Sequence, residues 1–591
     1  MTATLDNDSQ AATGGSTNSS TNNSAGSCLN SPTLSRRQTL SWAFGLTSGA
    51  VLAPLAACRG SATLAAFAAL DTLPEAPRLT ASGGLLSMDL TAKYAAQSLD
   101  MAVSQTMAYP GKSVKTSTTL RSFNGQYMAP TLVLTIGDTL RVKLINQLPA
   151  NVKGQSKLSY LNHQNSTNLH FHGLHVDPKE KNGVFGDYVV DTAEAGVLPG
   201  GTRQHQITLP PGHTNGIYWY HPHLHGSSNV QVSSGMFGAI LIKDPNEKFL
   251  RPDITERIIF VHKLGLTAAG RIESFYDSLN TPASNFLLNG AYQPTLVMRP
   301  GEVQSWHFIN SSSFYPFNPV MDGHTLQSYA RDGNAFDGIF KPVNEGTSNQ
   351  FGNQQWPGNA LYPGNRLSVV IQASMSPGTY FLRSVSAPSS DSNDEIVARI
   401  VVEGAAVAAA LPLASSLPRY ADQKPITDAE LASKGGKQRN LVLAILSKGD
   451  PLLPSPMPAG EEWAIPDGEP VRSFFYGTSF VLGNVGAGVK LAPFQSAVTT
   501  TQTVALKAVE EWTVNSLNSY PHPFHIHVND SYVVKVNGEA VTPFWADTLP
   551  VPPQGSITFR MRFSEFTGKY VWHCHALDHE DLGMMQLVEV I

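Results

Sequence analysis

Cysteine is scarce in this chain, which has three among its 591 residues: Cys28, Cys58 and Cys574. So few cysteines exclude a fold held together by many disulfides. Two of them lie in an N-terminal segment that we interpret below as a leader, so Cys574 is the one cysteine in the body of the protein. Because it has no partner there, Cys574 is expected to serve in chemistry or in packing.

The chain also has few charged residues and no long segment with the periodicity of an amphipathic helix. Charged residues make up 14% of the chain, and the net charge of −5 comes without a basic stripe or an acidic tail, so nothing points to nucleic acid. No long segment shows helical periodicity, whereas short alternating strands separated by Gly, Pro and Asn recur throughout. The length predicts two to four domains, and the pattern predicts an all-β fold of β-sandwiches.

Residues 1–58 are interpreted as a leader. Its first 34 residues are rich in Ser, Thr, Asn and Gly, and the basic pair Arg36 and Arg37 then precedes an apolar run of small residues. The pair resembles a twin-arginine export signal, and the sequence LAAC ending at Cys58 resembles a bacterial lipobox. We expect an exported protein of the periplasm or cell envelope, anchored through lipid on Cys58. The alternative is a chance cysteine in a segment cleaved elsewhere.

One sequence unit appears three times, each time as a strand, a break and an alternating strand ending in Asn. The copies are LTIGDTLRVKLIN ending at Asn146, LVMRPGEVQSWHFIN ending at Asn310, and VALKAVEEWTVN ending at Asn515. Their spacing is too long for a solenoid and suits tandem domains. We predict domains at residues 85–245, 255–405 and 435–591, with a linker at 406–434 that includes much of the Ala/Pro-rich stretch 404–420.

Histidine pairs are the most specific feature of the sequence. Chance predicts fewer than about one His-x-His pair in a chain of this composition. The chain has five: His170/His172, His221/His223, His223/His225, His525/His527 and His573/His575. Residues two apart in a strand point to the same face, so each pair offers two imidazoles side by side, which suits a transition metal.

The pair around Cys574 predicts two metal sites on one strand. If His573 and His575 point to one face, Cys574 points to the other. On its face the sulfur is joined by His522, His579 and Met584, and this ligand set is typical of a blue-copper electron-transfer centre. The opposite face, together with the pairs His170/His172, His221/His223 and His525/His527, offers eight imidazoles, which suit a cluster of several coppers rather than one ion.

Four motifs, LHFHG, YWYHPH, HPFHIH and HCHALDHEDLGM, resemble in this order the copper motifs of the multicopper oxidases. The resemblance covers the chain from about residue 90 and implies three cupredoxin-like Greek-key domains, the middle one without copper. It also implies four coppers per chain. The implied ligands of type 1 copper are His522, Cys574, His579 and Met584, and those of type 2 copper are His170 and His525. One type 3 copper would be held by His172, His221 and His575, and the other by His223, His527 and His573.

The same resemblance implies roles for several residues beyond the ligands. Glu580 is expected to relay protons, with a solvent-exposed turn residue as the alternative. A second acid, after the first motif, is also expected to relay protons; it is Asp187, with Asp177 and Asp191 as alternatives. Asp547 resembles a residue that fixes a copper ligand by a hydrogen bond, with a turn residue as the alternative. His225 is expected to be a partly buried hydrogen-bonded residue, with an extra metal ligand or a residue that supports a ligand as the alternative. The isolated histidines are not expected to bind metal: His163, His175, His205, His213, His262, His307 and His324.

The predicted function is that of a laccase-like multicopper oxidase. Electrons from a phenol, an aromatic amine or a metal ion would pass from Cys574 through His573 or His575 to dioxygen. The alternatives are a periplasmic oxidase of Cu(I), Mn(II) or Fe(II) and a copper-free scaffold relative, which would have lost ligands. The lack of a Met-rich segment disfavours a dedicated copper-detoxifying role. Three repeats and four complete motifs disfavour a two-domain nitrite reductase. No oligomeric state is predicted.

Overall fold

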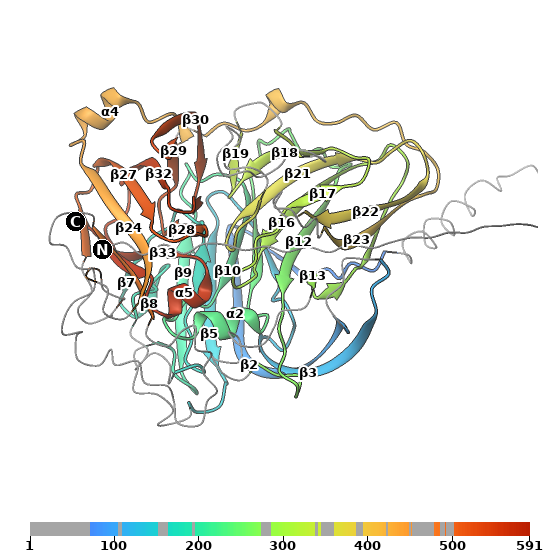
Figure 1. The fold of residues 1–591 in the computed structure, drawn as a ribbon, viewed down its shortest axis with the longest axis horizontal. Coiled ribbons are helices and arrows are strands. Elements are labelled where there is room, and N and C mark those ends of the chain that lie inside the picture. Colours follow the sequence, from blue (N-terminus) through green and yellow to red (C-terminus); the bar gives the residue numbers. More distant parts are fainter. Residues whose placement is uncertain are drawn as a thin grey trace, which may run out of the picture. The chain divides into compact units, whose positions relative to one another are not determined.

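The computed structural model describes residues 71–591 except for thirteen short gaps. The gaps are 104–108, 152–162, 192–195, 273–284, 337–340, 344–359, 386–393, 421–422, 448–450, 452–477, 485–490, 492–493 and 495–500. The predicted leader, with its export signal and Cys58, lies outside the described residues. The described strands form six sheets, two from each third of the chain, and this confirms the predicted all-β fold. Figure 1 shows the three groups of strands in blue-green, yellow-green and orange-red.

The first sandwich begins at Arg78, before the predicted domain start at residue 85. One sheet has the order β1 (Arg78–Thr80), β4 (Thr131–Thr135), β11 (Gly238–Lys243), β10 (Gly216–His221) and β6 (His170–His172). The other has the order β3 (Ser113–Phe123), β2 (Leu85–Ala102), β5 (Thr139–Asn146), β9 (Thr202–Thr208), β8 (Val184–Phe185) and β7 (Glu180–Lys181). Along β5 the apolar residues Leu140, Val142 and Leu144 are buried, as the period of two predicts.

The second sandwich repeats this layout. One sheet has the order β14 (Ala291–Tyr292), β13 (Phe286–Leu288), β12 (Thr255–Lys263), β16 (Val303–Asn310), β21 (Arg366–Gln372), β18 (Leu326–Arg331) and β19 (Asn334–Ala335), with β20 (Lys341–Val343) on β18. The other has the order β15 (Thr295–Met298), β23 (Glu395–Val402), β22 (Gly378–Ser384) and β17 (Pro319–Met321). The predicted linker that follows contains a 3-10 turn, η2 (Ala414–Ser416), and a short helix, α4 (Asp428–Ser433).

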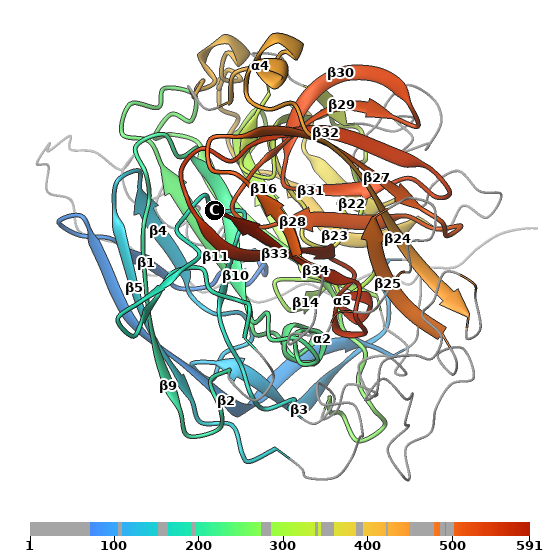
Figure 2. The same cartoon turned by 90° about the vertical axis from the view of Figure 1, so that its left-hand side faces the viewer.

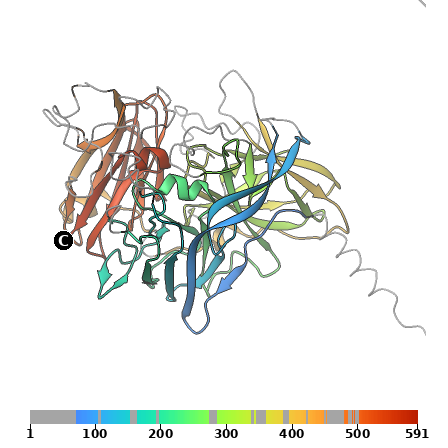
Figure 3. The same cartoon turned by 90° about the horizontal axis from the view of Figure 1, so that it is seen from below.

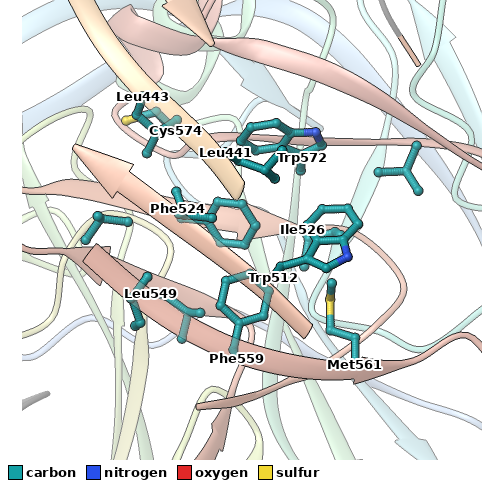
Figure 4. Packing of buried hydrophobic residues seen from close by; sticks show 14 of the residues in the cluster. Leu441, Leu443, Trp512, Phe524, Ile526, Leu549, Phe559, Met561, Trp572 and Cys574 are labelled. Carbon is teal, nitrogen blue, oxygen red and sulfur yellow. The ribbon is translucent and has the colours of Figure 1, made fainter. Parts of the chain in front are cut away.

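The third sandwich carries the last two copper motifs. One sheet has the order β25 (Thr478–Asn484), β24 (Gln438–Ser447), β27 (Val509–Ser516), β32 (Ser556–Arg562), β29 (Ser531–Val536) and β30 (Glu539–Ala546). The other has the order β26 (Thr501–Val504), β34 (Met585–Val590), β33 (Gly568–Cys574), β28 (His522–Ile526) and β31 (Thr548–Val551). Both sheets face one apolar core, in which Trp512, Phe524 and Trp572 pack together, with Cys574 at its margin (Figure 4).

The repeated sequence unit forms the same structure in each sandwich. Its first strand joins one sheet and its second strand joins the other, in each case next to a parallel neighbour. The side chains of Asn146 and Asn310 each accept a hydrogen bond from the backbone N–H two residues later. In the third copy Ser516 accepts this hydrogen bond, so the expected equivalence of Asn515 is wrong by one residue. A serine hydroxyl can replace the amide oxygen because both accept from a nearby N–H.

Two short helices lie side by side where the sandwiches meet, as Figures 2 and 3 show. They are α2 (Ser228–Ser233) of the first sandwich and α5 (Leu577–Asp581) of the third. The buried carboxylate of Asp581 accepts hydrogen bonds from the backbone N–H groups of Gly226 and Asn229, both at 2.7 Å. This contact holds α5 against the first sandwich. Among the described residues, no helix has the length and apolar character needed to cross a membrane.

Candidate metal centre

Strand pairing brings the histidine pairs together within each sandwich. In the first sandwich β6 and β10 are antiparallel, with His170 opposite His221. In the third sandwich β28 and β33 are antiparallel, with His525 opposite His573 and Phe524 opposite Cys574. Residues directly opposite each other on antiparallel strands have neighbouring side chains. Each pairing therefore places two sequence motifs side by side.

The histidines of the first and third sandwiches also meet across the junction between them. The rings of His170 and His527 stack at 3.8 Å between centroids, and those of His172 and His525 stack at 4.0 Å. The histidines predicted to bind the type 2 and type 3 coppers thus lie in one cluster, which we call the histidine site. Three groups within it have ligand atoms within 4.8 Å of one another: His170, His172, His525; His172, His221, His575; and His223, His527, His573.

Several nitrogens of the histidine site have no hydrogen-bond partner among the described residues. The Nδ1 atoms of His170, His221 and His525 face Asp187, the Pro222 carbonyl and the Asp547 carbonyl, at 2.8 to 3.0 Å. Their Nε2 atoms are buried and unpartnered. A buried ring nitrogen without a partner is costly unless a metal ion binds there. The cluster therefore fits transition-metal ions held through neutral imidazoles.

His172 is turned the opposite way to these histidines. Its Nδ1 atom lies 3.2 Å from Nε2 of His575, whereas its Nε2 atom lies 3.3 Å from the hydroxyl of Thr548 and 3.4 Å from Oδ1 of Asp547. With oxygen acceptors beside Nε2, the proton of the neutral ring belongs on that atom. The lone pair of Nδ1 is then free to face the nitrogen of His575, where a shared metal would sit.

Burial keeps these rings in the state that binds metal. Desolvation is the largest cause of the low pKa of His170, His172 and His525, and neighbouring histidines lower it further. A buried, uncompensated imidazolium is unfavourable, so the rings are neutral at physiological pH. A neutral imidazole has a lone pair for a metal ion.

Cys574 belongs to a separate group on the other side of its strand. Its Sγ atom lies 3.5 Å from Nδ1 of His522 and 3.4 Å from Nδ1 of His579, and all three side chains are buried. Met584 is buried in the same apolar core, and its backbone carbonyl accepts from the Cys574 N–H at 3.1 Å. Burial raises the pKa of the Cys574 thiol well above its usual range. We call this group the sulfur site.

Besides Asp547, two carboxylates touch the histidine site. Glu580 is fully buried, with Oε2 3.1 Å from Nδ1 of His573 and Oε1 3.5 Å from Nδ1 of His223. Asp187 accepts from the Phe171 N–H at 2.9 Å and lies against His170. Burial raises the pKa of Asp187 to about 8, against the effect of that hydrogen bond.

The alternatives to Asp187 lie elsewhere. Asp191 pairs with Arg203 at 2.5 Å, and Asp177 pairs with Lys181 at the surface. Asp547 hydrogen-bonds a predicted ligand, as the resemblance implies, but it does so through its backbone. Its backbone carbonyl accepts from His525, while its carboxylate binds Arg366.

The remaining histidines are placed as follows. His225 is buried against the ring of Phe494 and lies in none of the metal-binding groups found among the described residues. The isolated histidines His163, His175, His205, His213, His262, His307 and His324 are likewise outside those groups. Sequence reasoning missed Arg366 and Thr548, which contact the site from the second and third sandwiches. It also missed Phe314, whose ring lies beside His579.

Comparison with known proteins identifies the family. Family models described as multicopper oxidase match residues 103–247 and 484–591, which contain all four histidine motifs. The chain belongs to the multicopper oxidase family. The predicted resemblance, the enzyme class and copper as the cofactor are thereby confirmed. Such an oxidase reduces dioxygen with electrons taken from a reducing substrate.

Curated relatives agree with this assignment. A laccase of Bacillus subtilis (strain 168) is 23% identical over 521 residues, which cover 80% of this chain and 90% of the relative. The multicopper oxidase mco of Staphylococcus haemolyticus is 23% identical over 481 residues, covering 79% and 83%. The oxidase is thus a laccase-like member of the family.

Solved structures show the same fold. A multicopper oxidase from Campylobacter jejuni, titled a metallo-oxidase, matches with a TM-score of 0.61 and 20% identity, covering 88% of this chain and 96% of that one. A laccase-like multicopper oxidase from Ochrobactrum sp., titled for activity towards lignin model compounds, matches with a TM-score of 0.61 and 20% identity, covering 88% and 100%. The predicted cupredoxin-like sandwiches are confirmed.

Proposed function

We propose that the oxidase acts on phenols and aromatic amines, which it oxidises at the sulfur site. The proposal rests on Phe314, which lies beside His579, and on its neighbour Tyr315, two exposed aromatic side chains that we call the aromatic edge. Phe314 is 41% exposed, and its ring lies 5.7 Å from the ring of His579 at an interplanar angle of 67°. Tyr315, next to it, is 39% exposed. An aromatic substrate gains from such rings by edge-to-face or stacked contact.

The aromatic edge is held in place by the backbone. The Leu577 N–H, at the start of α5, donates to the Ser313 carbonyl at 3.0 Å. This contact joins the segment before Phe314 to the helix that carries His579. On the other side, the ring of Tyr520 lies 5.2 Å from His522 and 6.0 Å from His579. A substrate ring at this edge would lie close to a ligand of the sulfur site, which suits one-electron transfer through His579.

The twelve predicted ligands are proposed to hold four coppers, one at the sulfur site and three at the histidine site. When bound, copper supplies one-electron oxidation at the first site and four-electron reduction of dioxygen to water at the second. The chain links the two sites through Cys574. Nδ1–H of His573 donates to the Cys574 carbonyl at 3.1 Å, which adds a hydrogen-bonded connection to the covalent one.

Reduction of dioxygen to water consumes four protons, so a proton donor is needed at the histidine site. Glu580 is proposed for this role because its carboxylate lies between His223 and His573 and is shielded from solvent. Asp187 holds Nδ1–H of His170 and is proposed to keep that ring oriented with Nε2 toward the metal.

The substrate proposal is tested by steady-state kinetics on copper-loaded protein. We expect kcat/KM to be higher for phenols and aromatic amines than for Cu(I), Mn(II) or Fe(II). Phe314→Ala should raise KM for phenols about tenfold, the equivalent of about 1.4 kcal/mol of binding, and leave metal-ion kinetics unchanged. Leu413→Ala, an exposed residue in the linker, is the matched control. Equal effects of Phe314→Ala on both substrate classes would refute the aromatic-edge proposal.

One observation favours a second candidate, oxidation of metal ions. Asp578, the neighbour of His579, is half-buried, and its Oδ1 atom is buried and unpartnered among the described residues. A carboxylate oxygen suits Mn(II) or Fe(II). If kcat/KM for either ion exceeds that for phenols and falls in Asp578→Asn, this candidate replaces the first.

A copper-free scaffold role is disfavoured because the ligand positions are filled and the unpartnered nitrogens lie where metal would bind. Metal analysis should find close to four coppers per chain. The basic pair Arg36 and Arg37 and the lipobox-like Cys58 support a further proposal, export in the folded state and a lipid anchor at the cell envelope. Metabolic labelling with a fatty acid tests this proposal, since Cys58→Ala should abolish labelling.

A further inference from the structure

The second sandwich has no His-x-His pair, yet its turn 363–366 touches the histidine site. Gly364 lies in this turn with φ +90°, directly against the ring of His575. A Cβ atom at this position would lie 2.9 Å from two ring carbons of His575 and 3.1 Å from its Nε2. Real Cβ atoms do not approach a buried ring so closely, and positive φ also disfavours any other residue. The glycine therefore allows the turn to pack on a ligand.

Arg366, two residues later at the start of β21, reaches all three sandwiches. Its guanidinium is fully buried and donates to Oδ1 and Oδ2 of Asp547 at 2.7 and 2.6 Å. It also donates to the Ile217 carbonyl of the first sandwich at 3.3 Å. Its backbone N–H donates to Asp332 at 2.8 Å, within the second sandwich. A two-pronged Arg–carboxylate pair fixes orientation as well as distance.

The contact passes from Arg366 to two histidines through Asp547 and Thr548. The Thr548 hydroxyl donates to Oδ1 of Asp547 at 2.8 Å and lies 3.3 Å from both Nε2 of His172 and Nδ1 of His525. The Asp547 carbonyl accepts from Nδ1 of His525 at 2.8 Å. The amide of Asn365 in the same turn donates to the Thr548 carbonyl at 2.8 Å. The turn thus holds the segment that orients His172 and His525.

The first sandwich makes room for this pair. Gly173, which follows His172, has φ +84°, and a Cβ atom there would overlap Nη2 of Arg366 and lie 2.5 Å from Oδ2 of Asp547. The glycine that ends the LHFHG motif therefore lets the Arg366–Asp547 pair lie against the backbone beside the ligand His172. Groups from three distant parts of the chain meet at this point.

We propose that the turn 363–366 of the second sandwich positions the histidine site, with Gly364 packing on His575 and Arg366 orienting His172 and His525 through Asp547 and Thr548. The copper-free sandwich then has a specific role in copper binding besides spacing the other two. Arg366 is a positioning residue because it touches neither metal nor substrate. The sulfur site lies outside this set of contacts, so the inference predicts a selective effect on one site.

The first test is Arg366→Lys, which keeps the charge and loses the two-pronged geometry. We expect the blue absorption of the sulfur site to remain, the type 2 copper resonance to change, and the copper concentration needed to fill the histidine site to rise about 10- to 100-fold. The control is Arg383→Lys, because Arg383 makes a similar two-pronged pair with Asp322 in the same sandwich. The same copper titration and resonance in both variants would overturn the proposal.

The second test is Gly364→Ala, with Gly323→Ala as its control. Both glycines have positive φ, at +90° and +62°, but the nearest atom to a Cβ at Gly323 is a Tyr380 ring carbon 3.6 Å away. The two variants share the backbone strain, and only the first meets a histidine. We expect Gly364→Ala alone to lose copper from the histidine site. Equal copper contents in the two variants would overturn the proposal, even if Arg366→Lys failed to fold.

These readouts separate the inference from the proposed function on which it rests. Copper content and resonance are measured without a reducing substrate, so an error about the substrate class leaves the result unchanged. If the unsubstituted protein binds no copper, the proposed copper assignment fails. If it binds four and the variants match their controls, the positioning role fails.

Discussion

Replacing the sulfur of Cys574 by oxygen separates the two metal sites most cleanly. In Cys574→Ser the Cβ atom and the buried backbone stay, and the hydroxyl takes the place of a sulfur 3.4 to 3.5 Å from two histidine nitrogens. A serine hydroxyl is a much weaker donor to copper than a thiolate. The variant should therefore lose the blue colour and one of four coppers, while the histidine site keeps three.

The loss of folding free energy in Cys574→Ser should not exceed the cost of burying a hydroxyl without a good hydrogen-bond partner. A buried hydroxyl with an imperfect partner costs about 1–3 kcal/mol. In a domain of about 150–250 residues each kcal/mol lowers Tm by about 2–4 °C, so the fold should survive at room temperature. Oxidase turnover should nevertheless fall to the background rate, because electrons can no longer enter through the sulfur.

Three measurements check this reasoning on the same sample: copper per chain, visible absorption with electron paramagnetic resonance, and dioxygen uptake with a phenol. His324→Gln is a useful control, because His324 is buried in the second sandwich and contacts the Asp322 carbonyl and the Ser374 N–H, neither of which belongs to a metal site. It should keep colour and turnover. Blue colour in Cys574→Ser, or turnover equal to that of the parent, would refute the assignment of the sulfur site.

Three further outcomes are expected. Glu580→Gln should keep four coppers and lower turnover by about 10²- to 10⁴-fold, with the fully reduced protein slow to reoxidise in dioxygen; normal reoxidation would refute the proton role. Asp581→Ala should leave the N–H groups of Gly226 and Asn229 unpaired, and each should lower the free energy of unfolding by about 1–3 kcal/mol. An unchanged Tm would argue that Asp581 does not hold α5 against the first sandwich. Burial lowers the pKa of His175, but Glu565 and the Val528 carbonyl outweigh it and raise the pKa overall. The stability from this pair should be fully present below about pH 6.5 and lost as pH rises through the folded pKa, and Glu565→Gln should remove this dependence in unfolding titrations.

Much of the candidate site could be predicted because it depends on strand geometry. Successive residues of a strand face opposite sides, so HCH at the end of β33 implies that the side chain of Cys574 points away from those of His573 and His575. The structure places the sulfur with His522 and His579 and the two imidazoles in other groups. The alternation along β5 likewise predicted which face of the first sandwich is buried. These inferences needed only local periodicity.

Contacts that depend on loop conformation could not be predicted in this way. The resemblance favours Asp187 but leaves Asp177 and Asp191 as alternatives, and only the path of the loop after β6 places Asp187 beside His170. The third copy of the repeat shows the same limit. Its sequence matches the other copies at Asn515, but the hydrogen bond that Asn146 and Asn310 accept is accepted by Ser516, one residue later. A turn determines its register by hydrogen bonds that no periodic pattern encodes.

The second sandwich shows why a residue's function can be missing from its own sequence neighbourhood. Arg366 follows a turn and begins a strand, which would suit any surface arginine. It is buried because Asp547, 181 residues away, supplies the compensating carboxylate and Gly173 leaves the space. Gly173 and Asp547 resemble family positions, but Arg366 matched no motif, and the contact exists only where the three sandwiches meet. Sequence motifs therefore identify the groups that bind metal and one that orients them, Asp547, whereas Arg366 and Thr548 become recognisable only from the assembled structure.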